Sequence, residues 1–136
     1  MVHFLAKVLI VDDDLSMCQS ISRILTIEGY ECGSVDGALE AIKELKSGNY
    51  DLVISDVLMP GVSGNVLLSE VSEKFSDLAV VMMSAQDNKE TFVRCLMQKG
   101  YGYLIKPFSE NQLLICIKNA LLVRDLLLEN RKLKKE

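Results

Sequence analysis

The sequence lacks any long apolar segment. Its longest uninterrupted run of apolar residues extends only from Leu78 to Met83, whereas a helix needs about 20 such residues to cross a bilayer. The apolar stretch near the amino terminus is interrupted by Lys7 and leads into three aspartates at residues 12–14. It therefore does not have the form of a secretory signal peptide. We expect a cytoplasmic protein without a membrane segment.

The sequence also lacks paired cysteines and an excess of basic residues. The four cysteines form no C-x-x-C pair and no metal-ligand spacing, which favours reduced thiols that pack among apolar neighbours. Lysine and arginine number 15 against 19 aspartates and glutamates, for a net charge of -4. Binding to nucleic acid through phosphate contacts needs the opposite balance. We therefore expect no direct contact between this chain and nucleic acid.

Short apolar runs rich in valine and isoleucine recur along the chain. They are continuous rather than alternating with polar residues, as in strands that are buried on both faces of a parallel sheet. The five runs are residues 8–11, 32–35, 52–54, 79–83 and 103–105. With 136 residues, the chain has room for one domain. We predict an α/β fold: a doubly wound, flavodoxin-like sheet of five parallel strands in the order 2-1-3-4-5, with five helices.

Segments with helical spacing separate the apolar runs, and several carry end signals. Asp14 stands where a helix N-cap is favoured. Ser109 and Gln112 form the pattern of a capping box that begins the last helix. A glycine follows three of the segments, which predicts left-handed C-caps, at Gly29, Gly48 and Gly100.

Polar side chains follow four of the predicted strands. The first strand leads into Asp12 and Asp13, the third ends at Asp56, the fourth at Ser84 and the fifth at Lys106. The carboxyl ends of parallel strands share one end of the sheet. In the order 2-1-3-4-5, successive strands are added on opposite sides of strand 1, so a crevice opens between strands 1 and 3. We expect these side chains to meet there.

The expected crevice has a charge that calls for a cation. Carboxylates about 4 Å apart repel by about 4 kcal/mol at an effective dielectric constant of about 20. Three carboxylates and the Lys106 ammonium sum to -2, which one divalent ion would neutralise. Ligands that are all oxygen select a hard cation, Mg²⁺ or else Mn²⁺. A cation, a lysine and a hydroxyl group together suit phosphoryl transfer.

Four segments resemble the receiver domain of two-component response regulators, in particular the chemotaxis-regulator type. They are Val8–Asp14, Leu52–Gly61, Met82–Ala85 and Tyr103–Phe108. The resemblance covers residues 5 to 120 and implies a cytoplasmic phosphoprotein of a phosphorelay. Its partner would be a sensor histidine kinase or a phosphotransfer protein. Such a domain is not an enzyme for other substrates, since it catalyses only its own phosphorylation and dephosphorylation.

The resemblance also implies a role for each acidic residue of the crevice. Asp56 would accept the phosphoryl group from a phosphohistidine. Asp12, Asp13 and Asp56 would hold Mg²⁺, and the backbone carbonyl of Leu58 would add a further metal ligand.

The same resemblance assigns the polar residues of strands 4 and 5. Lys106 and Ser84 would each bind a phosphoryl oxygen, and the Lys106–Pro107 peptide bond would be cis. Ser84 and Tyr103 would form a switch that changes one face of the domain. This face is made by the helical segment around residues 93–97 (helix 4), the strand of residues 103–105 (strand 5) and the helix that begins at Ser109 (helix 5). A half-buried packing role for Tyr103 fits the sequence equally well. A homodimer through this face, or through the carboxyl-terminal helix, is compatible with the resemblance.

Apolar helical spacing continues past residue 120 without proline or glycine. We predict a receiver domain over residues 1–120 and an extended helix over residues 121–136. In heptad register, Val123 and Asn130 take position a, and Leu126 and Leu133 take position d, a pattern found in dimeric coiled coils. The helix is then a coiled-coil linker to an output domain. A solvated amphipathic helix is the alternative.

Two other functions compete with the receiver interpretation. Asp12 and Asp14 have the spacing of the acid pair in haloacid-dehalogenase phosphatases, with Asp12 as the nucleophile, but that assignment leaves Asp56 without a role. The other alternative is a receiver-like interaction module that is never phosphorylated. The complete set of acids, Ser84 and Lys106 weighs against it.

Overall fold

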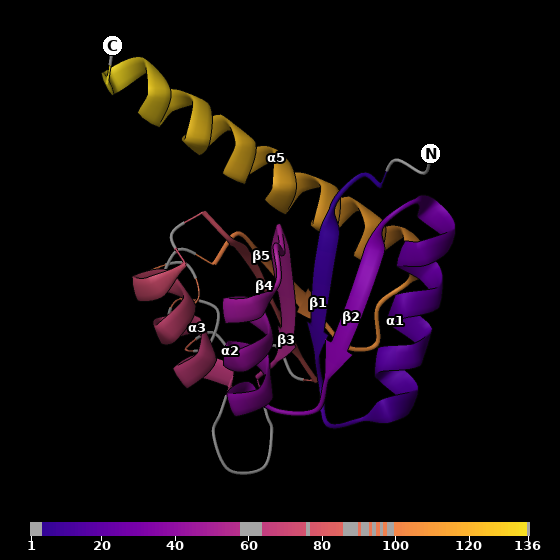
Figure 1. Ribbon diagram of the computed structural model, residues 1–136. Coiled ribbons are helices and arrows are strands. Elements are labelled where there is room, and N and C mark those ends of the chain that lie inside the picture. Colours follow the sequence, from indigo (N-terminus) through magenta and orange to yellow (C-terminus); the bar gives the residue numbers. More distant parts are fainter. Residues whose placement is uncertain are drawn as a thin grey trace.

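The computed structural model contains one five-stranded sheet with helices on both faces (Figure 1). It describes residues 4–57, 64–75, 77–85, 90, 93, 95, 97 and 100–135. The strands are β1 (Lys7–Val11), β2 (Glu31–Val35), β3 (Leu52–Asp56), β4 (Ala79–Ser84) and β5 (Gly102–Ile105). All neighbours pair in parallel, in the order β2-β1-β3-β4-β5. The predicted topology is confirmed.

The helices form two layers that enclose the sheet. The elements α1 (Leu15–Glu28) and α5 (Glu110–Lys135) cover one face. The other face is covered by α2 (Ala38–Ser47) and α3 (Gly64–Lys74). A further helix was predicted between β4 and β5, where most residues lie outside the described part of the chain. The residues described there at positions 93, 95 and 97 are helical.

Burial explains why the apolar runs of the sequence are continuous. Every residue of β3 and of β4 is buried, and so are four of the five residues of β1. These three strands lie in the middle of the sheet, with an apolar cluster on each face. The edge strands β2 and β5 are more exposed, which is why their runs are less apolar.

Three of the predicted helix ends are confirmed. The Asp14 carboxylate caps α1 and accepts a hydrogen bond from the backbone N–H of Met17 at 3.3 Å. Gly29 ends the same helix with a φ of 114°. At the start of α5, the N–H of Gln112 donates to Ser109 Oγ at 3.1 Å and the N–H of Ser109 donates to Gln112 Oε1 at 2.8 Å. This is the reciprocal arrangement of a capping box.

The other two predicted left-handed caps were wrong. Among the described glycines, positive φ occurs at Gly29. Gly48 is extended, with a φ of -114°, and a Cβ atom there would lie 2.8 Å from Cε2 of Tyr50. At Gly100, a Cβ atom would overlap the Sγ atom of Cys95. Close approach of a neighbouring side chain, rather than backbone conformation, is what these two positions require.

The last helix is extended, as predicted. α5 has 26 residues and is about 39 Å long at 1.5 Å per residue. In Figure 1 it crosses the end of the sheet where the strands begin, and its carboxyl-terminal part projects beyond the body. Within the described residues, no helix is both long and apolar enough to span a membrane.

Candidate functional site

The carboxyl ends of four strands bring the polar residues to one edge of the sheet. Asp12 follows β1, Asp56 ends β3, Ser84 ends β4 and Lys106 follows β5. The parallel register sets the relative positions of these residues: Val11 pairs with Ser55, Asp56 with Met83, and Ser84 with Ile105. The convergence predicted from the sequence is therefore confirmed at the level of the backbone.

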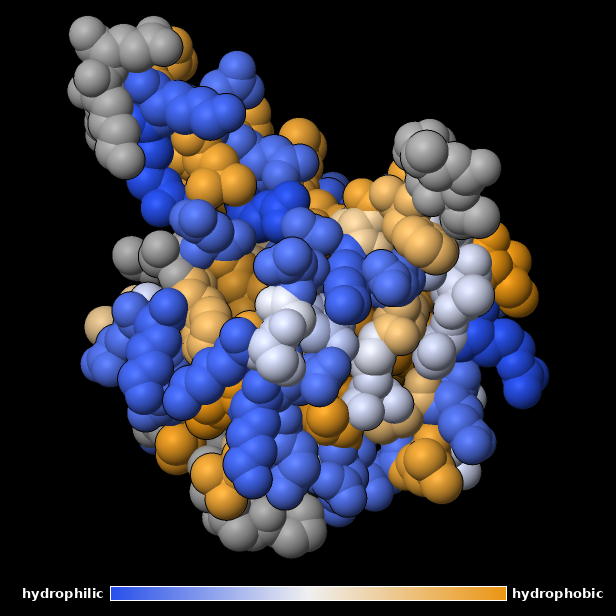
Figure 2. Space-filling view, in the orientation of Figure 1, coloured by the Kyte–Doolittle hydropathy of each residue, from blue (hydrophilic) through white to orange (hydrophobic). Residues whose placement is uncertain are grey.

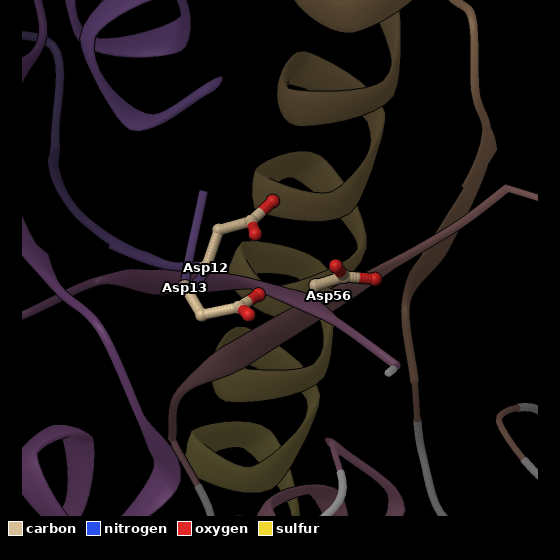
Figure 3. A group of neighbouring side chains, drawn as sticks. All are labelled: Asp12, Asp13 and Asp56. Carbon is tan, nitrogen blue, oxygen red and sulfur yellow. The ribbon is translucent and has the colours of Figure 1, made fainter. Parts of the chain in front are cut away.

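Three carboxyl groups form a compact acidic cluster. One oxygen of each of Asp12, Asp13 and Asp56 lies within 4.8 Å of the others (Figure 3). Asp12 is 1% exposed and Asp56 9%, whereas Asp13 is exposed. Two of the three charges are therefore withdrawn from water, and they need compensation from the protein or from an ion.

Lys106 supplies part of that compensation. Its Nζ atom lies 3.1 Å from Asp12 Oδ2 and 3.2 Å from Asp56 Oδ2. Burial alone would lower the pKa of this ammonium group, but the hydrogen bonds and charges of Asp12 and Asp56 outweigh it and raise the pKa. Lys106 is therefore a permanent cation that joins the ends of β1 and β3.

Backbone contacts hold Asp12 in place. Its N–H donates to the carbonyl of Val35 at 3.2 Å, and its Oδ1 atom accepts from the N–H of Asp14 at 2.9 Å. These bonds leave the side chain little freedom, so the position of its Oδ2 atom is set before any ligand binds.

Cys18 is a contributor that the sequence interpretation treated only as a packing residue. Its thiol lies under the site and donates to the backbone carbonyl of Asp12 at 3.3 Å. Burial, followed by the charge of Asp12, raises the pKa of this thiol, so it remains a protonated donor. The signal in the sequence was weak: Cys18 lies six positions after Asp12, on the inward face of α1.

Ser84 and Tyr103 lie on the strands next to the acidic cluster. Ser84 is buried, and its backbone carbonyl accepts from the N–H of Lys106 at 2.7 Å. Tyr103 is half-buried and packs against the apolar cluster on the α2 and α3 face. The peptide bond between Lys106 and Pro107 is cis, as the resemblance implied. Leu58 lies outside the described residues.

The donor set fits a hard divalent cation. It consists only of carboxylate oxygens, and its net charge with Lys106 is -2, from three carboxylates and one ammonium group. A hollow of about 470 Å³ borders Asp12 and Asp13 between α1 and α2. An ion can therefore reach the exposed Asp13 carboxylate from solvent.

The sequence matches a known family and several characterised proteins. The family model described as "Response regulator receiver domain" matches residues 8–118. Response regulator protein FleR of Pseudomonas aeruginosa is 38% identical over 109 residues, which is 80% of this chain and 23% of FleR. The C4-dicarboxylate transport transcriptional regulatory protein DctD of the same organism is 32% identical over 128 residues, covering 94% of this chain and 28% of DctD. The chain thus spans about a quarter of the length of these relatives.

Solved structures show the same fold. NtrX from Brucella abortus, in complex with ADP, superposes with a TM-score of 0.89 and 30% identity, over 98% of this chain and 30% of NtrX. Response regulator protein TrrA from Thermotoga maritima, in complex with Mg(2+)-BeF, has a TM-score of 0.78 and 30% identity, over 85% of this chain and 99% of TrrA. The complex of TrrA therefore carries magnesium on a fold that this chain shares.

Proposed function

Because the chain belongs to the response regulator receiver domain family of two-component signalling, we propose that Asp56 is its phosphoryl acceptor. The phosphoryl group would come from the phosphohistidine of a sensor histidine kinase or a phosphotransfer protein, in a Mg²⁺-dependent reaction. The observation that carries this proposal is the pairing of Lys106 with Asp12 and Asp56 beside Asp13. No other group of acidic, cysteine or histidine side chains among the described residues reaches this density.

The chemistry needs no general base. An oxygen of the Asp56 carboxylate attacks phosphorus in line with the phosphorus–nitrogen bond of the donor. That bond breaks, its electron pair stays on the imidazole nitrogen, and an acyl phosphate forms on Asp56. The carboxylate has no proton to lose, so the absence of a histidine from the cluster is no obstacle.

The remaining residues would hold the ion and the transferred group. Asp12, Asp13, Asp56 and the carbonyl of Leu58 would bind Mg²⁺, or else Mn²⁺. When bound, the ion would neutralise charge on the phosphoryl oxygens. Lys106 would bind one of those oxygens.

Ser84 and Lys106 would convert phosphorylation into a conformational change. Two new charge-assisted hydrogen bonds are worth about 3 to 6 kcal/mol together, and reversing a 1:99 equilibrium takes about 5.5 kcal/mol. Since Lys106 already pairs with the Asp56 carboxylate, its new bond replaces an existing one, and the net gain lies below that sum. The new bond from Ser84 to the phosphoryl group must then supply much of the free energy of the switch. As Ser84 moves toward that group, Tyr103 would fill the space that Ser84 leaves.

The output is proposed to pass through the face that contains β5 and α5. Receiver residues 1–120 and the helix over residues 121–136 would be two functional parts. A homodimer would form through this face or through the α5 extension. Nucleic acid contacts, such as those indicated by the description of NtrC as a DNA-binding transcriptional regulator, would belong to parts of a longer protein outside this chain.

The two competing functions fit the site less well. A phosphatase that uses Asp12 as nucleophile needs an available Asp12 oxygen, but both are engaged: Oδ1 accepts from the N–H of Asp14 and Oδ2 from Lys106. A module that is never phosphorylated would have no use for the paired lysine between two buried acids.

A single experiment separates these functions. The chain is incubated with acetyl phosphate and Mg²⁺ and its intact mass is measured. We expect one phosphoryl adduct, which is absent from Asp56→Asn. Asp36→Asn is the control and should form the adduct, because Asp36 is an exposed acid on the hollow that borders Asp12 and Asp13. An adduct that persists in Asp56→Asn would contradict the proposal, as would release of phosphate without an adduct or no reaction at all.

A further inference from the structure

The carboxyl-terminal part of α5 lies against the opposite edge of the sheet from the acidic cluster. One stripe of the helix faces the receiver along most of its length. Its members are Leu113, Ile117, Ala120, Arg124, Leu128 and Arg131, spaced three or four positions apart. The first three are fully buried, whereas Arg124 and Arg131 form ion pairs with the receiver. Past residue 120 the stripe thus adds ion pairs at Arg124 and Arg131 to the apolar contact of Leu128.

Arg124 makes the stronger of the two ionic contacts. Its Nη1 atom lies 2.8 Å from Asp51 Oδ1 and 3.2 Å from the backbone carbonyl of Asp51. The Arg124 side chain is only 16% exposed, so water screens this pair less than an ordinary surface pair. Arg131 adds a second contact, with Nη2 at 2.9 Å from Asp77 Oδ1.

Asp51 is a fixed anchor for this contact. Its Oδ2 atom accepts the N–H of Lys7 at 2.8 Å, and its own N–H donates to the carbonyl of Lys7 at 2.8 Å. Its carbonyl also accepts the N–H of Ala79 at 3.1 Å. Asp51 is thereby bonded to β1, to β4 and to α5 at once.

Apolar packing at this place is incomplete. A hollow of about 480 Å³ remains between the sheet edge and the helix, and Tyr50, Phe75, Leu78 and Leu128 contribute to its lining. Leu113, Ile117 and Ala120 fix the first part of the helix by apolar packing. Past residue 120 the helix does not fill this space, so the ion pairs have the larger part in setting how the extension lies on the receiver.

We propose that the Asp51–Arg124 and Asp77–Arg131 pairs act as a latch. The latch holds the extension of α5 at a fixed direction and rotation, so that the extension moves with the sheet as one rigid arm. It also turns the opposite side of the helix to solvent, where Leu122, Leu126 and Leu133 are 56%, 57% and 66% exposed. Figure 2 shows hydrophobic groups among hydrophilic ones on the part of α5 that projects from the body. The latch operates in the unmodified protein and does not depend on phosphorylation.

Amide hydrogen exchange of the full chain, read by mass spectrometry over residues 122–132, tests the latch. We expect Arg124→Gln to speed exchange there about tenfold, since a partly buried charge-assisted contact is lost and helix propensity is nearly unchanged. Asp51→Asn should have a similar effect, and the double variant should add little. Asp125→Asn is the control. It removes the ion pair of Arg124 with its neighbour in the helix and leaves the pair with Asp51, so the exchange rate should stay within about twofold of that in the unmodified chain.

Several outcomes would overturn the proposal. These are unchanged exchange in Arg124→Gln, or an effect of Asp125→Asn as large as that of Asp51→Asn. The proposal would also be overturned if the double variant speeds exchange by the product of the two single effects. Such a product means that Asp51 and Arg124 act independently, whereas two residues of one contact give little further change. If Asp51→Asn disturbs β1 or β3, the exchange rate of Arg124→Gln alone tests the proposal, because that substitution lies on α5 and leaves the strands unchanged.

Discussion

Replacing Lys106 by methionine should tighten Mg²⁺ binding while it weakens the fold. Lys106 is the cation between Asp12 and Asp56, and methionine keeps much of its length without the charge. Removing the ammonium changes the charge of the cluster from -2 to -3, counted over three carboxylates and one lysine. A unit charge about 5 Å from the bound ion is worth about 3 kcal/mol at an effective dielectric constant of about 20. Solvent at the exposed Asp13 reduces this value, so we expect binding at least about tenfold tighter.

Isothermal titration calorimetry with MgCl₂ at constant ionic strength measures this effect. Lys118→Met is the matched control, because Lys118 is an exposed lysine of α5 that pairs with Glu28 at 3.5 Å. Glu28 is the last residue of α1, whereas the acidic cluster lies at the first end of that helix. Equal or weaker Mg²⁺ binding by Lys106→Met would refute the idea that this ammonium and the ion share the same carboxylates.

The same variant should be less stable in the absence of Mg²⁺. Asp12 and Asp56 are buried and would lose their cation. We expect the free energy of unfolding, measured with urea at neutral pH, to fall by about 3 kcal/mol. The pKa of Lys106 is raised above its ordinary value of 10.5 in the folded protein. Its stabilisation is therefore complete below pH 10.5 and is lost as the pH rises through the folded-state pKa. The stability difference between the two proteins should shrink over that alkaline range, and a difference that grows there would contradict the assignment.

Three further substitutions test the helix ends and the close contacts, each by urea unfolding. Ser109→Ala removes one bond of the capping box of α5 and should cost about 1 kcal/mol. Gly29→Ala forces a side chain into a φ of 114° and should cost about 1 kcal/mol. Gly100→Ala should cost about 1 to 3 kcal/mol, because its Cβ would overlap Cys95 Sγ. The control is Gly37→Ala, which meets only the flexible end of the Glu40 side chain. A loss for Gly37→Ala equal to that for Gly100→Ala would refute the steric explanation.

Much of the fold could be predicted because the burial of a strand determines which residue types it contains. The continuous apolar runs of β3 and β4 arise from helices on both faces of the sheet. Helix ends were predictable only where the signal is local. The capping box of Ser109 and Gln112 lies within four residues. Gly100, in contrast, is required because a side chain there would overlap Cys95, and no sequence spacing predicts that contact.

The candidate site was predictable for a different reason. Parallel strands bring their carboxyl ends to one end of the sheet whatever the lengths of the connections, so Asp12 and Asp56, on neighbouring strands, had to lie close together once the strand order was known. Lys106 follows β5, two strands from β3, and meets them because its side chain is long. The pairing of Arg124 with Asp51 has no such rule behind it. The two residues are 73 positions apart, and whether an arginine on a long helix meets an aspartate or only solvent depends on the angle at which the helix crosses the sheet.

The two ends of β3 have separate chemistry and a shared backbone. Asp56 ends this strand at the acidic cluster, and Asp51 precedes its first residue at the contact with α5. The strand between them, about 17 Å long, is fully buried and paired on both sides with β1 and β4. A strand held in this way is displaced as a unit rather than bent, because close-packed interiors do not absorb local shifts. A displacement at Asp56 would therefore reach the α5 extension by two routes, through the β5 face and through Asp51. The second route works only as long as Arg124 keeps the helix on its anchor.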